Sequence, residues 1–315
     1  MGMVTTQPYR FELSLEKSSC KMKHAILILA HKDFDQVRHL IEYFVRDCYV
    51  YVHIDKKAAI TPEELHSIDS MPQVRAVYRK FDVHWGGFSI LQAELWLVEH
   101  SYQDSYADYY HLISGQDYPI KPIEAFLHFF EENMGMDYIE YKAYKTNNWE
   151  QDSFFDRFRY FFRYDDVEGR SPSGRYYIDE QIRLQVSRGQ TREPIHTFDT
   201  IYKGSQWMSI TNISVHNILE YSSSCPSFLN RLKYTFAPEE SYFHTVLLNM
   251  TGGKNVYNNC LRYIRWRGEN GNNPSNLGIE HFKELQLSDA IFARKMEFPY
   301  CNELIKKIDE TLITH

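Results

Sequence analysis

The chain has 315 residues, a formal net charge of −7, and hydrophobic and charged shares of 43% and 24%. These values are typical of a globular protein with a sizeable core, and the negative balance argues against a nucleic-acid-binding protein. Aromatic residues make up 16% of the chain. Such a surplus of amphipathic rings suggests a surface that stacks on a flat, hydroxylated ligand, an interface, or simply a biased composition.

Targeting signals are absent from the sequence. No run of about 18 apolar residues could span a membrane. Residues 1–21 lack the apolar segment of a secretory signal, so we expect a loose N-terminal extension. The five cysteines are widely spaced and contain no CxxC pair, which is typical of a reducing compartment and predicts a cytoplasmic protein.

The first half of the chain predicts an open, mostly parallel α/β sheet. AILILAH, which begins at residue 25, predicts a buried strand, DFDQVRHLIEYFVRD a helix, and YVYVHID a second strand. TPEEL indicates the start of a second helix, 74–79 a third strand, and Phe88 the start of a long amphipathic helix. Residues 109–120 predict a further strand that ends in a Gly-containing turn.

Polar residues follow three of these predicted strands, namely His31, the His53–Asp55 pair, and the segment from Ser114 to Asp117. Open α/β sheets bind ligands outside the carboxyl ends of their strands. We therefore expect these three strand ends to line one site.

The second half is less regular. Residues 143–200 show few alternations, SPSG at 171–174 predicts an exposed turn, and the segment resembles an inserted lobe. From Ile201 the sequence predicts a strand in GSQWMSIT, helices in NISVHNILEYSS and PEESYFHTVLLNM, and a short strand in LRYIRW. With no repeat or low-complexity linker, we expect one domain over 22–315, divided into 22–142, the lobe, and 201–315.

Common catalytic motifs are missing. The sequence has no GxxxxGK[ST], GxGxxG, HExxH or GxSxG, which argues against P-loop, dinucleotide-binding, metal-hydrolase and serine-hydrolase functions. Its one literal Asp-x-Asp, Asp33–Asp35, directly follows the first strand, and its simplest role is to cap the first helix.

Seven short motifs remain: VHIDKK (52–57), HWGGFS (84–89), LISGQDYPIK (112–121), GSQWMSIT (204–211), APEESYFHT (237–245), IRW (264–266) and IFARKME (291–297). In this order and spacing the chain resembles the core-2/I-branching glycosyltransferases, a family that includes the peptide O-xylosyltransferases. The resemblance runs from about Met22 to Lys295. It implies a GT-A fold, a UDP-sugar donor, inversion at the anomeric carbon, and no required metal or other cofactor.

The resemblance also implies catalytic roles. Glu240 matches the family's general base, which takes the proton of the attacking hydroxyl. Glu239 stands where the family has Asp, and two glutamates are also what the first turn of a helix favours. Lys295, with Arg294 beside it, matches the lysine that neutralises the departing diphosphate; the alternative is a solvated pair at a helix end.

Further residues match the donor site, each with a structural alternative. Asp55 matches the acid near the uracil and could equally cap a strand end. Ser114 and Asp117 would line the site, although Asp117 could simply cap a turn. The upstream arginine of the family has no clear counterpart; the candidates are Arg265 and Arg267.

Two pairs of residues complete the expected site. Gly86 and Gly87 permit close backbone approach, either to the donor or between elements. Trp207 and Trp266 match aromatic positions that face sugars, and either could instead belong to the core.

The predicted function is a bacterial-type, inverting glycosyltransferase of surface polysaccharide synthesis, with GlcNAc as the first choice of sugar and xylose or galactose as alternatives. The arginines and aromatics of FDRFRYFFRYDDVEGR could hold an anionic acceptor such as a lipid-linked oligosaccharide, contact the inner membrane surface, or form a dimer. Two rivals are a non-catalytic carbohydrate-binding relative and a metal-dependent hydrolase that uses His31, His53 and His84.

Overall fold

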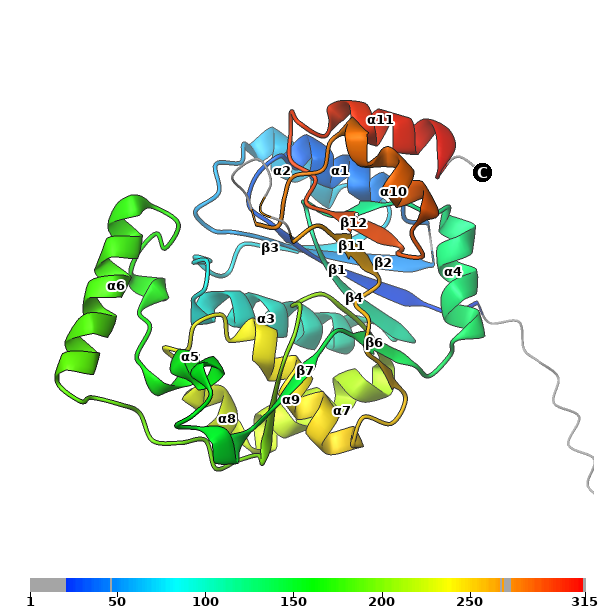
Figure 1. Cartoon of the computed structure of the whole chain (residues 1–315). Helices are drawn as coiled ribbons and strands as arrows, with labels where there is room; N and C mark the ends of the chain where they lie inside the picture. Colours follow the sequence, from blue (N-terminus) through cyan, green and yellow to red (C-terminus); the bar gives the residue numbers. More distant parts are fainter. Residues whose placement is uncertain (1–20, 46, 267, 269–272, 314–315) are drawn as a thin grey trace, which may run out of the picture.

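The computed structural model describes residues 21–313 except 46, 267 and 269–272. The predicted N-terminal extension (1–21) thus lies outside the described residues apart from its last position. The described part contains a central seven-stranded sheet in the order β10-β6-β9-β4-β1-β2-β3 (Figure 1). Its strands are β1 (His24–Ala30), β2 (Cys48–Ile54), β3 (Val74–Tyr78), β4 (Tyr109–Ser114), β6 (Asp137–Ile139), β9 (Met208–Thr211) and β10 (Val256–Tyr257).

The prediction of a mostly parallel α/β sheet is confirmed. Strands β3, β2, β1 and β4 run parallel, as does the pair β10 and β6, while β9 is antiparallel to both of its neighbours. Almost every side chain of β1, β2 and β4 is buried, as expected for strands covered on both faces. Ala30 pairs with Ile54, and Leu29 with Ser114, so the carboxyl ends of these three strands meet at one edge.

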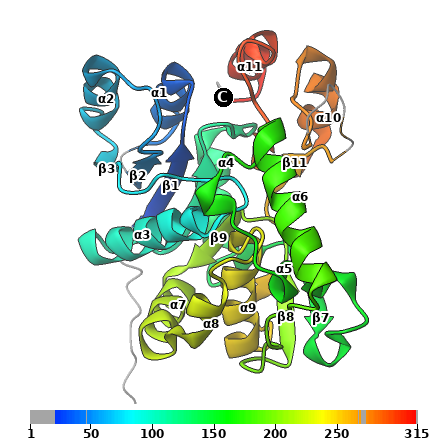
Figure 2. The ribbon, with the colours of Figure 1, turned by 90° about the vertical axis from the view of Figure 1, so that its left-hand side faces the viewer.

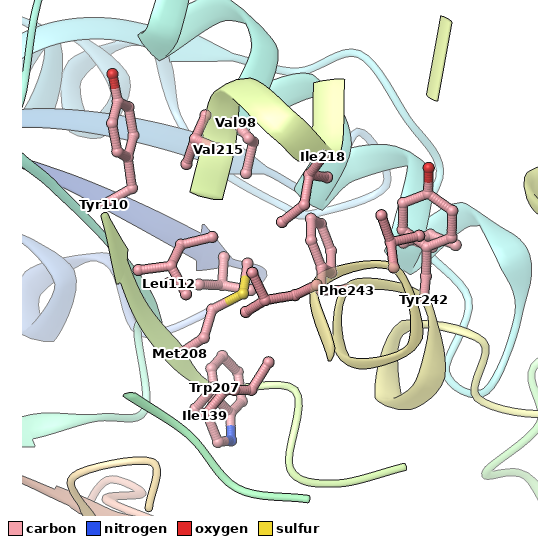
Figure 3. Close-up of a cluster of buried hydrophobic side chains, with 14 of the residues drawn as sticks. Val98, Tyr110, Leu112, Ile139, Trp207, Met208, Val215, Ile218, Tyr242 and Phe243 are labelled. Atoms are coloured by element: carbon pink, nitrogen blue, oxygen red, sulfur yellow. The ribbon is translucent and has the colours of Figure 1, made fainter. Parts of the chain in front are cut away.

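Helices cover both faces of the sheet. One face carries α1 (Phe34–Glu42), α2 (Pro62–Asp69) and α4 (Ile123–Glu132), and the other carries α3 (Phe88–Asp104), α7 (Asn212–Ser224) and α9 (Glu239–Thr251) (Figure 1). Figure 3 shows how Phe243 of α9 and Ile218 of α7 pack with Met208 of β9 in this second layer. Helix α9, which carries both candidate catalytic glutamates in its first turn, is therefore fixed against the sheet.

The capping residues predicted for the first two helices agree with the structure in one case and not in the other. Thr61 and Glu64 form the capping box that TPEEL predicts for α2. Asp33 holds the N-cap position of α1, but its side chain makes no capping hydrogen bond, because the residue adopts a left-handed backbone with φ of 54°. The prediction that Asp33 caps this helix through its side chain is wrong.

A second, small sheet lies beyond the end of β4. It contains β11 (Arg262–Ile264), β12 (Phe292–Arg294) and β5 (Tyr118–Pro119), and it packs with α10 (Phe282–Leu287) and α11 (Asn302–Thr311). Because β12 pairs with β5, only four residues after β4, the end of β12 is brought back to the carboxyl edge of the main sheet.

The segment 143–200 is more regular than predicted. Strand β7 (Lys142–Lys145) pairs with β8 (Thr200–Lys203), and α5 (Asp156–Arg159), α6 (Pro172–Ser187) and α8 (Pro226–Arg231) lie on this side of the molecule (Figures 1 and 2). The exposed turn predicted at 171–174 is wrong, because Ser171 accepts a hydrogen bond from the Gly174 N–H and Pro172 opens α6. Short 3₁₀ turns lie at η1 (Thr146–Asn148), η2 (Ser153–Phe155), η3 (Tyr164–Asp166) and η5 (Ile279–His281).

No helix in the described part of the chain combines the length and the apolar composition needed to cross a bilayer.

Candidate active site

A cavity of about 320 Å³ opens at the carboxyl edge of β1, β2 and β4, and we call it the edge cavity. Its volume is within the usual range of about 300–1,000 Å³ for small-molecule sites. All three of the strand ends singled out from the sequence contribute to its lining, through His31, the His53–Asp55 pair and Ser114. Other polar lining residues are Lys57, Gln116, Glu168, Arg170, Gln206 and Arg294.

Asp55 both closes β2 and faces the edge cavity. Its Oδ1 accepts hydrogen bonds from the backbone N–H groups of Lys57 (3.0 Å) and Val83 (3.1 Å), and its Oδ2 lies 3.4 Å from the Lys57 Nζ. The two interpretations of this residue, strand-end cap and site residue, are therefore compatible.

Arg294 is held by a buried polar cluster and an aromatic ring. Its guanidinium donates to Asp117 Oδ2 (2.9 Å) and Ser114 Oγ (3.1 Å), and its Cζ lies 4.1 Å from the centroid of the Trp207 ring. Asp117 is fully buried and also accepts from the Ser114 N–H (2.7 Å) and hydroxyl (2.6 Å). Asp117 thus orients Arg294 from behind and does not line the edge cavity, whereas Ser114 and Trp207 do.

Lys295 lies beside the edge cavity without lining it. It directly follows β12 and is only 8% exposed, so the alternative of a solvated pair at a helix end is wrong. Its Nζ lies 2.7 Å from Glu297, which also pairs with Lys32. Although burial opposes it, hydrogen bonds from these two lysines lower the pKa of Glu297 to about 2.

Glu240 lies in the first turn of α9 between two cations. Its Oε2 is 3.2 Å from Arg157 of α5 and 3.1 Å from Lys203 of β8. In the described residues, no ion pair or hydrogen bond involves its other oxygen, Oε1. One oxygen thus fixes the carboxylate, and the other is available to a ligand.

Two more carboxyl groups are buried behind Glu240. Burial raises the pKa of Glu239 to about 8, with the charge of Glu240 as the next cause, and burial also raises the pKa of Glu94 well above its ordinary value. Glu94 accepts a hydrogen bond from Gln206 Nε2 (3.0 Å). Burial thus favours the protonated form of both Glu239 and Glu94, and Glu240 is the one of the three whose carboxylate forms ion pairs with cations in the described residues.

A second hollow, of about 560 Å³, lies on the lobe side of Glu240, and we call it the lobe hollow. Arg157 and Lys203, which both pair with Glu240, line it together with Lys142 and aromatic side chains such as Phe154 and Phe236. Three residues after Lys203, Gln206 already lines the edge cavity. Glu240 itself lines neither space, but its two ion-pair partners line the lobe hollow, and its carbonyl accepts a hydrogen bond (2.9 Å) from the N–H of Gly204, two residues before Gln206.

Both glycines of HWGG pack against other parts of the protein. A Cβ on Gly86 would lie 2.8 Å from the Phe236 ring, and one on Gly87 would lie 2.2 Å from Asp165 Oδ1. Gly86 also has a φ of 76°. The close backbone approach is between elements, and neither glycine lines the edge cavity.

The remaining candidates lie elsewhere. Trp266 is 55% exposed and does not line the edge cavity. Arg265 does not line it either, and its guanidinium nitrogen lies 3.0 Å from a carboxylate oxygen of Glu284. Arg267 lies outside the described residues. His84 uses Nδ1 for a hydrogen bond with the Val167 carbonyl (3.0 Å), and it does not line the edge cavity with His31 and His53. The described ranges contain no group of three His, Cys, Asp or Glu side chains placed to hold a metal ion.

Neither Glu168 nor Glu94 was predicted, and Arg170 was expected only among the arginines of 155–170 that could hold an anionic acceptor, not at the strand ends. Glu94 had a usable signal, because it shares the buried stripe of α3 with Leu91, Leu97 and Val98, where a carboxylate is unusual. The positions of Glu168 and Arg170 at the edge cavity had no such signal, since no periodicity predicts which cavity a loop reaches.

The family described as "Core-2/I-Branching enzyme" matches residues 25–288. The chain belongs to this family. Xylosyltransferase oxt of Drosophila melanogaster is 23% identical over 307 residues, which cover 89% of this chain and 32% of that protein. Xylosyltransferase sqv-6 of Caenorhabditis briggsae is 24% identical over 243 residues, which cover 74% of this chain and 27% of that protein. The chain therefore spans a third or less of these relatives.

A likeness to the Staphylococcus aureus TarS crystal structure has a TM-score of 0.30 and 10% identity, over 38% of this chain and 21% of that one. A similarity this weak says nothing about the position or role of any residue in this chain. The family membership predicted from the seven motifs is confirmed, while a bacterial origin stays a prediction.

Proposed function

We propose that this branching-enzyme chain is an inverting glycosyltransferase that moves a sugar from a UDP-sugar to a glycan hydroxyl without a metal ion. The observation that carries the proposal is the position of Glu240. Its carboxylate pairs with Arg157 and Lys203, which line the lobe hollow, and its backbone carbonyl accepts a hydrogen bond from Gly204, two residues before Gln206 of the edge cavity. An inverting transfer needs one carboxylate that meets the acceptor while the donor binds on the other side of the reacting carbon.

The edge cavity would hold the donor. Asp55 and Ser114 line it at the strand ends, and Trp207 offers a ring face. Arg294, which lines this cavity, and Lys295 at its border supply positive charge where the diphosphate of the leaving UDP gains negative charge. Asp117 would contribute indirectly, since it holds Arg294 in place.

The lobe hollow would hold the acceptor. Glu240 would take the acceptor hydroxyl's proton on Oε1 while the hydroxyl oxygen forms a bond to the anomeric carbon. The bond from that carbon to the β-phosphate oxygen breaks, and its electron pair leaves with UDP. The protonated neighbour Glu239 keeps a second negative charge away from this step.

The sugar and the acceptor are the finer parts of the proposal. GlcNAc is the first choice, and the names of the xylosyltransferase relatives support xylose as the second candidate. Lys142, Arg157 and Lys203 line the lobe hollow together with Asp152 and Asp156, and our first choice of acceptor remains an anionic glycan such as a lipid-linked oligosaccharide. A cytoplasmic location, contact with the inner membrane and a role in surface polysaccharide synthesis remain predictions.

The test is a panel of UDP-GlcNAc, UDP-xylose and UDP-galactose, with release of UDP as the readout. We expect Glu240→Gln to lower the rate of the best donor by about 10²–10⁴-fold, the usual contribution of general base catalysis. Binding of UDP, measured by calorimetry, should not change. Glu63→Gln, at an exposed first-turn glutamate of α2, is the matched control.

Each outcome has a definite meaning. Full turnover in Glu240→Gln contradicts the role of this residue as base. A wild-type protein that binds UDP but releases none from any donor supports the carbohydrate-binding rival instead.

A further inference from the structure

Residues 164–170, which we call the strap, begin with η3 and lead to the start of α6. The strap contributes Glu168 and Arg170 to the lining of the edge cavity. Sequence analysis gave this segment no role in donor binding. The Arg170 side chain is exposed, and its Cζ lies 5.3 Å from the centroid of the Trp85 ring, which also lines the cavity. A cation of the lobe thus faces the same space as the strand ends of the main sheet.

The other long basic side chains at this cavity already have carboxylate partners. Lys57 pairs with Asp55, Arg294 with Asp117, and Lys295 with Glu297. Within the described residues, Arg170 has no such ion pair. Its guanidinium therefore has its charge and its forked donors available for an anionic ligand.

The charge of Arg170 also reaches its neighbours. Burial is the first cause that lowers the pKa of His31 and that of Lys295, and the positive charge of Arg170 lowers both further. It acts in the same direction on buried Arg294. The carboxylates of Glu168 and Glu297 oppose this repulsion at Arg170, and an anion bound beside its guanidinium would relieve it further.

The strap is fixed to the main body on both of its sides. Asp165 accepts hydrogen bonds from the backbone N–H groups of Phe88 (2.8 Å) and Ser89 (3.1 Å) and from the Ser89 hydroxyl (2.6 Å). It thereby caps α3, whose own N-cap residue, Gly87, has no side chain to do so. The Val167 carbonyl bonds to His84, so Arg170 is presented from an anchored loop.

We propose that Arg170 is a diphosphate-binding residue, whose guanidinium pairs with phosphate oxygens of a nucleoside diphosphate in the edge cavity. It would add a cation of the lobe to Arg294, which lines the same cavity, and Lys295 at its border. A guanidinium binds phosphate through two parallel N–H donors, so this contact would also orient the donor. The inference rests on the proposed function, because it requires a nucleotide-sugar donor in this cavity.

The experiment is calorimetric titration of UDP, of UMP and of uridine into wild type, Arg170→Ala, Arg170→Lys and Arg175→Ala. Arg175, an exposed residue near the start of α6, is the matched control. We expect Arg170→Ala to raise the Kd of UDP about 10- to 100-fold, the usual effect of losing hydrogen bonds to a charged group. UMP should lose less affinity, Arg170→Lys should recover part of the loss, and Arg175→Ala should bind normally.

Thermal unfolding of each variant would show that the exposed substitution leaves the fold intact. Equal UDP affinity in wild type and Arg170→Ala overturns this inference but leaves the proposed function standing. The same loss for UMP and UDP rules out a contact with the β-phosphate, and an equal loss for uridine as well would place the contact on the nucleoside and overturn the inference. A wild-type protein that binds neither UDP nor a UDP-sugar instead contradicts the proposed function itself.

Discussion

At the residue scale, partners and burial give three neighbouring carboxyl groups different properties. Glu240 is 28% exposed at its side chain and has Arg157 and Lys203 beside it, whereas Glu239 and Glu94 are buried without a cation in hydrogen-bond contact. Taking a carboxylate out of water favours its protonated form. The same residue type thus occurs once in ion-pair contact with two cations and twice in a buried environment that favours the protonated form.

The buried proton on Glu239 predicts a pH-dependent stability. The pKa of Glu239 is raised from an ordinary 4.5 to about 8 by burial and by the charge of Glu240. Between those values the native state binds a proton that the unfolded chain does not, so the stability due to this group is complete below the lower value and falls as pH rises toward 8. Glu239→Gln removes the titration, and its stability relative to wild type should rise with pH, by at most about 1.4 kcal/mol per pH unit.

Urea unfolding of both proteins at several pH values between about 5 and 8 would measure this difference, because the free energy of unfolding extrapolates linearly to water. The comparison is made in a Glu94→Gln background, because the charge of Glu239 is one of the causes that raise the pKa of Glu94. Parallel stability curves with and without Glu239→Gln in this background would contradict the buried proton.

At the element scale, the strap predicts an unusual dependence of α3 on a residue 77 positions away from it. Asp165→Ala removes the acceptor for the Phe88 and Ser89 N–H groups, and we expect a loss of about 1–2 kcal/mol in the free energy of unfolding, as for other helix caps. Asp166→Ala is the control, since this exposed neighbour pairs only locally with Arg163 and should cost less than about 1 kcal/mol. Urea unfolding measures both, and equal small losses would show that α3 does not need this cap.

Elements with a buried stripe were predictable, and those without one were not. The strands β1, β2 and β4 are indicated by apolar runs, and helices α1, α3 and α9 by the apolar residues of their buried faces. Helix α6 buries few residues, Gly174, Ile178 and Gln185 among them, so its sequence has no apolar periodicity. Ser171 and Pro172 are compatible with a turn as well as with a helix start. Because no periodic set of apolar residues follows them in the sequence, the pattern favours the turn.

At the scale of the whole molecule, the candidate site combines segments with different degrees of predictability. The strand ends at His31, Asp55 and Ser114 were predictable, because parallel topology places such ends at one edge. The position of Arg294 required the pairing of β12 with β5, and the family motif supplied the residue without the geometry. Arg170 reaches the edge cavity through a cap on α3 made by a residue from the lobe, which is a tertiary contact that no local pattern predicts.

This arrangement makes a further prediction about metal ions. Arg170, Arg294 and Lys295 bring three positive charges to or beside one end of the edge cavity, and such charge can stabilise a diphosphate directly. We therefore expect UDP to stabilise the protein equally with and without excess EDTA, by about 2.7 kcal/mol at one hundred times its Kd. Thermal unfolding with UDP, with EDTA, and with Mn²⁺ added back after EDTA would measure the effect. If the UDP-induced shift in Tm disappeared in EDTA and returned with Mn²⁺, a metal ion would hold the diphosphate and the metal-free mechanism would be wrong.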